Sequence, residues 1–144
     1  MNQLEKEKKI NRLISLFTNG EIEKCNNEAR KAIEIYPKEP FLFNLLGAIH
    51  AEKALFEEAI NYYKNAINLN PEYFEAYNNM GVAYNHWKKP NRAVESLRHA
   101  IKLNPSYPEA LNNLGNSQKE LEKFEDAIDS YKKALKIDPN YIDA

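Results

Sequence analysis

The chain has 144 residues, a formal net charge of -1 and 43% hydrophobic residues. This length suits one domain or one short repeat array. The balance of 20 basic against 21 acidic residues argues against a nucleic-acid-binding surface. No apolar run is long enough for a membrane-spanning helix, and the four glycines form no phosphate-binding loop. The single cysteine excludes an internal disulfide framework and gives no reason to expect an oxidising compartment.

Many residues recur every 34 positions along the chain, beginning with Gly47, Gly81 and Gly115. Such a fixed period is the sequence signature of a solenoid. Further sets with the same spacing are Pro37, Pro71, Pro105 and Pro139; Ala59, Ala93 and Ala127; Ala32, Ala66, Ala100 and Ala134; and Asn44, Asn78 and Asn112. We therefore interpret residues 1–144 as a single array with repeats 6–39, 40–73, 74–107 and 108–141, and residues 142–144 as the start of an unfinished fifth repeat.

Each repeat is predicted to contain two helices. Apolar residues follow a helical period in 41–53 and again in 57–69. Second helices are predicted to end before Pro71, Pro105 and Pro139, because proline disfavours helical geometry in the residue before it. One helix pair cannot bury its own apolar stripe, so stacked pairs must form the core. The predicted fold class is all-α: a right-handed solenoid of antiparallel helix pairs with glycines and alanines at the close crossings.

The repeated residues resemble the tetratricopeptide repeat. That family combines a large residue, Leu-Gly, Tyr, Ala, an aromatic residue, Ala and Pro at set offsets. The matching residues are Phe43, Leu46, Gly47, His50, Ala59, Tyr63, Ala66 and Pro71 in repeat two; Tyr77, Met80, Gly81, Tyr84, Ala93, Leu97, Ala100 and Pro105 in repeat three; and Leu111, Leu114, Gly115, Gln118, Ala127, Tyr131, Ala134 and Pro139 in repeat four.

Repeat one departs from this pattern and is interpreted as a divergent cap. Leu13 stands in the place of the glycine, and Cys25 and Ala29 replace the alanine and the aromatic residue. The first helix of this repeat carries an apolar stripe that either lines the groove or belongs to the core. Its members are Ile10, Leu13, Ile14 and Phe17.

The resemblance implies a cytoplasmic scaffold that binds a protein or peptide in a concave groove lined by the first helices, without catalytic residues or a cofactor. The histidines lack the spacing of a zinc motif, so no metal site is predicted. Two alternatives remain open. One is the substrate-presenting N-terminal region of a larger enzyme, such as a glycosyltransferase or a sulfotransferase. The other is a module for self-assembly.

Asparagines dominate the positions that the family uses for groove contacts. A side-chain amide both donates and accepts, so a row of amides can hold a peptide backbone. The row is similar to the asparagine ladder in the repeat region of O-GlcNAc transferases, but asparagine at this position also occurs in repeats of no special function. The candidate groove residues are Asn11, Asn44, Glu75, Asn78, Asn79, Glu109, Asn112, Asn113 and Asn116.

The charges at the groove positions lean negative. Glu75 and Glu109 belong to this set, whereas the positions of the family's carboxylate-gripping clamp hold no cation. We therefore expect a basic or neutral polar ligand rather than an acidic peptide. The alternative is that these charges are simply a solvated face.

The last complete helix is expected at about 125–137, with part of its apolar face uncovered. Either the chain is a fragment of a longer protein, or a second copy covers this face in a homodimer or an end-to-end stack. The candidate self-association residues are Ile128, Tyr131 and Leu135.

Overall fold

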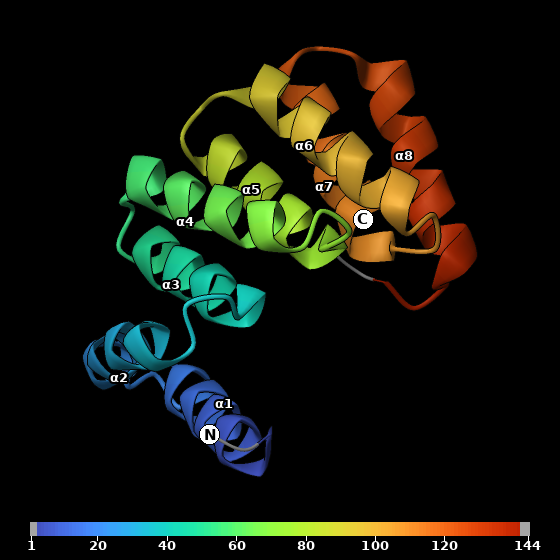
Figure 1. Cartoon of the computed structure of the whole chain (residues 1–144). Helices are drawn as coiled ribbons and strands as arrows, with labels where there is room; N and C mark the ends of the chain where they lie inside the picture. Colours follow the sequence, from blue (N-terminus) through green and yellow to red (C-terminus); the bar gives the residue numbers. More distant parts are fainter. Residues whose placement is uncertain (1–2, 142–144) are drawn as a thin grey trace. The chain divides into compact units, whose positions relative to one another are not determined.

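The computed structural model describes residues 3–141, which form eight α-helices and no strand (Figure 1). This confirms the predicted all-α class. No helix in the described range is long and apolar enough to cross a membrane. Residues 142–144, assigned to a fifth repeat, lie outside the described residues. The helices are α1 (Gln3–Thr18), α2 (Ile22–Ile35), α3 (Pro40–Glu52), α4 (Phe56–Leu69), α5 (Phe74–His86), α6 (Pro90–Leu103), α7 (Pro108–Glu120) and α8 (Phe124–Ile137).

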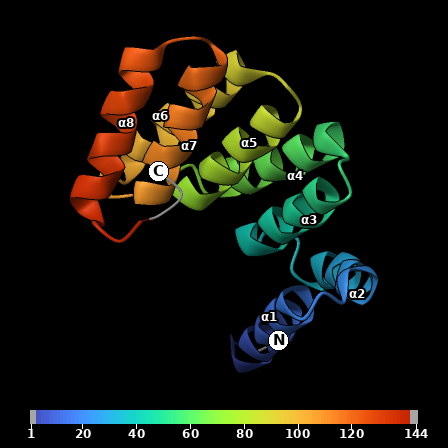
Figure 2. The same ribbon diagram turned by 180° about the vertical axis from the view of Figure 1, so that it is seen from behind.

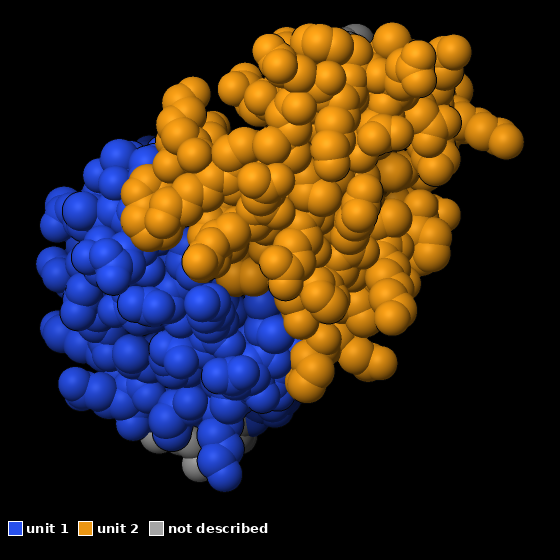
Figure 3. Space-filling model, turned by 90° about the horizontal axis from the view of Figure 1, so that it is seen from above, with its two compact units in different colours: residues 1–70 blue, residues 71–144 orange. Residues whose placement is uncertain are grey.

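The helices form two compact units, which Figure 3 colours separately. Unit 1 runs to Asn70 and contains α1–α4, whereas unit 2 begins at Pro71 and contains α5–α8. Within each unit every helix packs against the next one along the chain, and α5 also contacts α7. Figures 1 and 2 show the two helices of each pair side by side, joined by a short turn. Each unit is therefore two stacked helix pairs.

The turn inside each pair ends its first helix in the same way. The second of its three residues has a positive φ: 80° at Gly20, 59° at Ala54, 61° at Lys88 and 60° at Glu122. After α3, the Ala54 N–H donates to the Ala51 carbonyl at 2.9 Å, and the next N–H donates to the His50 carbonyl at 2.9 Å. These two bonds define a Schellman motif, which satisfies helix-end carbonyls and favours glycine at the residue with positive φ.

Glycines permit the close crossing of the helices in three of the pairs. A Cβ atom added to Gly47 would lie 2.5 Å from Tyr63 Cε1, and one added to Gly115 would lie 2.5 Å from Tyr131 Cε1. At Gly81 the obstacle is Leu97 Cγ, again at 2.5 Å. The predicted role of these glycines in close packing is thus confirmed, because no side chain fits between the backbone and the facing residue.

The divergent pair α1–α2 exchanges the large and small residues of this crossing. Leu13 on α1 and Ala29 on α2 are both fully buried in the core of unit 1. The buried Cys25 Sγ donates to the Leu13 carbonyl at 3.4 Å, and burial raises the pKa of its thiol. At the surface the Arg12 guanidinium makes two bonds to the Glu28 carboxylate, at 2.6 and 2.9 Å. This pair therefore fills the helix crossing with a large residue on its first helix and a small residue on its second.

The turn geometry predicts that Ala54→Gly and Gly20→Ala change the stability of the protein in opposite directions. Ala54→Gly relieves a left-handed conformation, so we expect unit 1 to gain about 0.5–1 kcal/mol of stability. Gly20→Ala introduces that conformation at a non-glycine residue, so we expect a loss of about 1 kcal/mol. Urea denaturation of the two variants measures both effects. Shifts of the same sign would contradict this account of the turns.

The glycine crossings predict that Gly47→Ala costs more stability than Gly115→Ala. Tyr63 is 2% exposed and cannot move away from a new Cβ, whereas Tyr131 lies nearer the surface and can shift outward. We expect a net loss of about 1–2 kcal/mol for Gly47→Ala, after the helix-propensity gain of alanine is subtracted from the overpacking cost. Thermal and urea unfolding of both variants checks this order. Equal losses would show that the facing side chain does not decide the cost.

Candidate functional site

A chain of polar side chains joins α5 to α7 in unit 2. The Asn113 side-chain amide donates to Asn78 Oδ1 at 3.1 Å, and the Asn85 side-chain amide donates to the backbone carbonyl of Asn113 at 3.5 Å. The Ser117 hydroxyl donates to Asn85 Oδ1 at 2.8 Å. We call these four residues, Asn78, Asn85, Asn113 and Ser117, the amide seam. Two of them, Asn78 and Asn113, are predicted groove residues that the structure brings together.

The amide seam shows that α5 and α7 run parallel. Asn78, early in α5, bonds to Asn113, whereas the later Asn85 bonds to Asn113 and to the still later Ser117. Asn78 is fully buried, and its amide also donates to Glu109 Oε1 at 3.2 Å. Its amide therefore ties the two helices together, while the more exposed Asn113 lies at the surface of the seam.

Acidic groups gather where α5 and α7 begin. Glu75 and Glu109 occupy the first turns of these helices, where a negative charge is favourable to the helix dipole. Both carboxylates act on the Tyr107 hydroxyl: its pKa is raised, mainly by burial and further by Glu109 and Glu75. The Tyr107 ring meets the edge of the Phe74 ring, with 5.4 Å between centroids. The two predicted glutamates thus both lie near Tyr107 and make the end of this face where α5 and α7 begin acidic.

The opposite end of the same face holds a cavity of about 250 Å³ with a different charge. Cations from Lys88 and Lys119 line it, with Glu120 as the acid, and the side chains of Asn85 and Asn113 bring the amide seam into its wall. A positive end on this face was not expected from the sequence. The complete lining is Val82, Asn85, His86, Lys88, Asn113, Asn116, Lys119 and Glu120.

Asn116 and Asn112 are placed in contrasting ways on α7. Asn116 is exposed, lines the cavity, and its Oδ1 accepts from the Tyr131 hydroxyl at 2.7 Å. Asn112 is 3% exposed, and its Oδ1 has no hydrogen-bond partner among the described residues. A buried acceptor without a donor is rare in native structures. Of these two predicted groove residues, only Asn116 offers its side chain to a ligand in the cavity.

The remaining predicted groove residues lie on separate first helices. Asn11 is exposed on α1, Asn44 is half-buried on α3, and Asn79 is half-buried on α5. The apolar stripe of α1 divides between the two alternatives: Leu13 belongs to the core, whereas Ile14 is 41% exposed. Unit 1 therefore shows an apolar first-helix surface at Ile14, and unit 2 shows a polar one.

The outer face of α8 carries the residues predicted for self-association. Ile128 and Leu135 are 52% and 38% exposed, and Phe124 on the same helix is 57% exposed. Tyr131 lies between them in sequence but is partly covered, because it packs over Gly115 and bonds to Asn116. Burial raises the pKa of its hydroxyl. Tyr131 thus has a structural role within its own pair.

Asn85, Lys88, Ser117 and Lys119 belong to the site but were not among the predicted groove residues. Asn85 and Lys119 take the twelfth position of their repeats, which the family resemblance already marks as a groove position. Ser117 and Lys88 lie outside those positions, so only the structure reveals their part. Lys88 reaches the cavity from the turn where φ is positive. Turn geometry of this kind leaves no separate sequence signal.

The histidines and the cysteine do not come together as metal ligands. Among residues 3–141 no group of three or more His, Cys, Asp or Glu side chains is placed to hold a metal ion. His50 is buried, its Nδ1 lies 2.8 Å from the Leu46 carbonyl, and its ring is 4.9 Å from the Tyr62 ring. As predicted, His50 fills the packing position of the repeat tyrosine.

Solved structures share the fold of the chain, although no curated protein sequence matches it. A crystal structure of MamA is 20% identical with a TM-score of 0.83, over 92% of this chain and 78% of that one. MamA from Desulfovibrio magneticus RS-1, from residue 41 to its end, is 20% identical with a TM-score of 0.81, over 92% and 75%. The first TPR of Spaghetti (RPAP3), bound to the HSP90 peptide SRMEEVD, is 26% identical with a TM-score of 0.71, over 73% and 83%. These likenesses confirm a solenoid of antiparallel helix pairs.

Models of known families match the sequence directly. The model described as tetratricopeptide repeat matches residues 74–107 and 108–141, and the model described as TPR repeat matches residues 56–85. Together the matches run from residue 56 to residue 141, which is more than half of the chain. With the helix pairs, the glycine crossings and the structural likenesses, these matches show that the chain belongs to the tetratricopeptide-repeat family.

Proposed function

We propose that this chain is a protein-binding scaffold that holds a peptide segment along the polar face of α5 and α7 in unit 2. The observation that carries the proposal is the cavity of about 250 Å³ whose wall contains Asn85, Asn113 and Asn116. Side-chain amides both donate and accept, so they match the alternating groups of a peptide backbone. The structure of RPAP3 bound to the peptide SRMEEVD supports this class of ligand.

The amide seam makes this face suitable for recognition because its geometry is fixed before a ligand arrives. The buried Asn78 holds α5 against α7, so little conformational entropy is lost on binding. Each helix has 13 residues and is therefore about 20 Å long. An extended peptide covers that length with about six residues. The face thus suits a short linear segment.

The charges on this face predict the polarity of the ligand. Glu75 and Glu109 stand at the beginning of the parallel helices, whereas Lys88 and Lys119 line the cavity at their ends. A ligand with a basic group at the first end and an acidic group at the second is complementary to both. This refines the sequence-based expectation of a basic or neutral polar ligand, which rested on the acidic end.

Selection from a library of random seven-residue peptides tests the proposal. We expect enriched peptides with a basic residue near one end and an acidic residue near the other. Asn116→Ala combined with Lys119→Glu should weaken their binding at least about tenfold, because a charge-assisted bond and an amide contact are lost. Fluorescence anisotropy with the enriched peptides measures the change at low and high salt.

A matched control separates the cavity from general charge effects. Lys132→Glu changes one exposed lysine that does not line this cavity, and it alters the net charge by the same amount as the cavity variant. This control should alter the affinity less than twofold. Enriched peptides that bind the cavity variant and wild type equally, or a library that yields no enriched peptide, would refute the proposal.

Self-association is a second candidate function, favoured by the exposed apolar residues Ile128 and Leu135 of α8. Val94 and Ile101 of α6, the residues equivalent to Ile128 and Leu135, are instead partly covered, and α6 packs against α7 of the next helix pair. A helix of a second copy that covers α8 would bury these apolar residues in the same way.

Light scattering coupled to size exclusion tests this second candidate. Wild type should show a concentration-dependent mass above that of the 16.7 kDa chain, and Ile128→Glu should lower it. Ile128 is a cleaner site for this test than Tyr131, whose ring also packs over Gly115. Lys132→Glu on the same helix serves as the control. A wild type that stays monomeric at millimolar concentration would exclude self-association through this face.

A further inference from the structure

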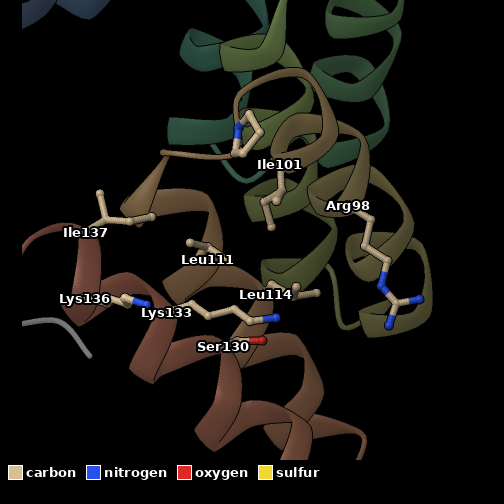
Figure 4. A pocket seen from close by; sticks show the side chains of 9 residues that line it. Arg98, Ile101, Leu111, Leu114, Ser130, Lys133, Lys136 and Ile137 are labelled. Carbon is tan, nitrogen blue, oxygen red and sulfur yellow. The ribbon is translucent and has the colours of Figure 1, made fainter.

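A second pocket of about 360 Å³ lies in unit 2 among α6, α7 and α8 (Figure 4). Leu111 and Leu114 of α7, Ile101 of α6 and Ile137 of α8 make its surface largely apolar. We call this site the apolar pocket. Its volume is at the lower end of the range of ligand sites, so it has room for one or two apolar side chains. None of its residues was predicted to bind a ligand.

The apolar pocket faces away from the amide seam. Successive residues of a helix are turned by about 100°, so Leu111 and Leu114 lie on nearly the opposite side of α7 from Asn113 and Asn116. Ser130 carries the one neutral polar side chain of the lining, and its buried hydroxyl donates to Gln118 Oε1 at 2.7 Å. Because this donor is already used inside the protein, the wall at Ser130 demands no polar ligand group.

Positive charge borders the apolar pocket from two different helices. Figure 4 shows Arg98 on α6 to one side of the leucines and Lys133 and Lys136 on α8 to the other. No acidic residue is among the residues that line it. Lys133 pairs with Asp129 at 3.1 Å, but both side chains are over 60% exposed, so this pair contributes little. Arg98 and Lys136 make no ion pair with any described residue.

We propose that the apolar pocket binds a leucine or phenylalanine anchor in an acidic protein segment, which gives unit 2 a second binding face. The apolar surface requires an apolar group, because a polar group buried there would lose its hydrogen bonds to water. The cations stand on both sides of that surface, so they complement carboxylates that precede and follow the anchor. A fatty acid, with one carboxylate, would match only one of these sides.

Anisotropy with a labelled nine-residue peptide tests this inference. The probe has a central phenylalanine with two glutamates on each side, and the comparison peptides replace the phenylalanine by serine or the glutamates by lysines. We expect binding of the probe alone, weakened at least about tenfold by Arg98→Glu combined with Lys136→Glu. The control, Arg92→Glu with Lys132→Glu, changes the charge equally on the same two helices outside the pocket and should alter binding less than twofold.

Charge exchange keeps the test informative even if the reversed variant is less stable. The Arg98→Glu/Lys136→Glu protein should gain affinity for the lysine-flanked peptide, which an unfolded protein would not do. Ile137→Ser, at an exposed lining position, should weaken the glutamate probe without changing this charge preference. Three results would each overturn the proposal. They are an equal loss of affinity for the probe in the Arg92/Lys132 control, no binding of the probe at 1 mM, and displacement of the probe by dodecanoate.

The outcome is independent of the proposed function on α5 and α7. Asn116→Ala/Lys119→Glu changes that face only, so it should leave the glutamate probe bound. Loss of probe binding in this variant would place the peptide on the amide seam instead and would overturn the assignment to the apolar pocket.

Discussion

The structure depends on a constant combined volume where the two helices of each pair cross. Protein interiors are packed as densely as organic crystals, so a large residue on one helix needs a small one opposite. Gly47 faces Tyr63 and Gly115 faces Tyr131, whereas the divergent pair buries Leu13 on its first helix and Ala29 on its second. Because the crossing is preserved by exchange of sizes, the turns and the next interface can repeat along the chain.

The helix pairs could be predicted because packing itself has the period of the sequence. Small residues must return wherever helices cross, and a proline returns wherever a second helix has ended. The second helices end at Leu69, Leu103 and Ile137, two residues before their prolines, as predicted. Pro90 likewise begins α6, where its missing N–H is harmless. These features follow from local sterics, which a single sequence records directly.

The candidate site was predictable only in part, because it depends on differences between neighbouring residues. Asn112 and Asn113 are adjacent on α7, yet one is buried with an unpartnered oxygen and the other lies at the surface of the amide seam. A turn of about 100° along the helix separates these outcomes, and the sequence pattern does not resolve it. The apolar pocket draws its lining from three helices. Its arginine and lysines can pack their aliphatic stems against apolar surface while their charged ends stay in water. Such a combination has no motif.

The turn between α5 and α6 gives the molecule its own optical reporter. Trp87, the one tryptophan of the sequence, stacks on Tyr84 with 6.4 Å between ring centroids, and the Lys89 ammonium lies 3.7 Å above its ring. The next residue, Lys88, lines the cavity on the polar face. Indole emission depends on nearby charge and solvent, so occupancy of that cavity and opening of this turn can be followed by intrinsic fluorescence in the unmodified protein.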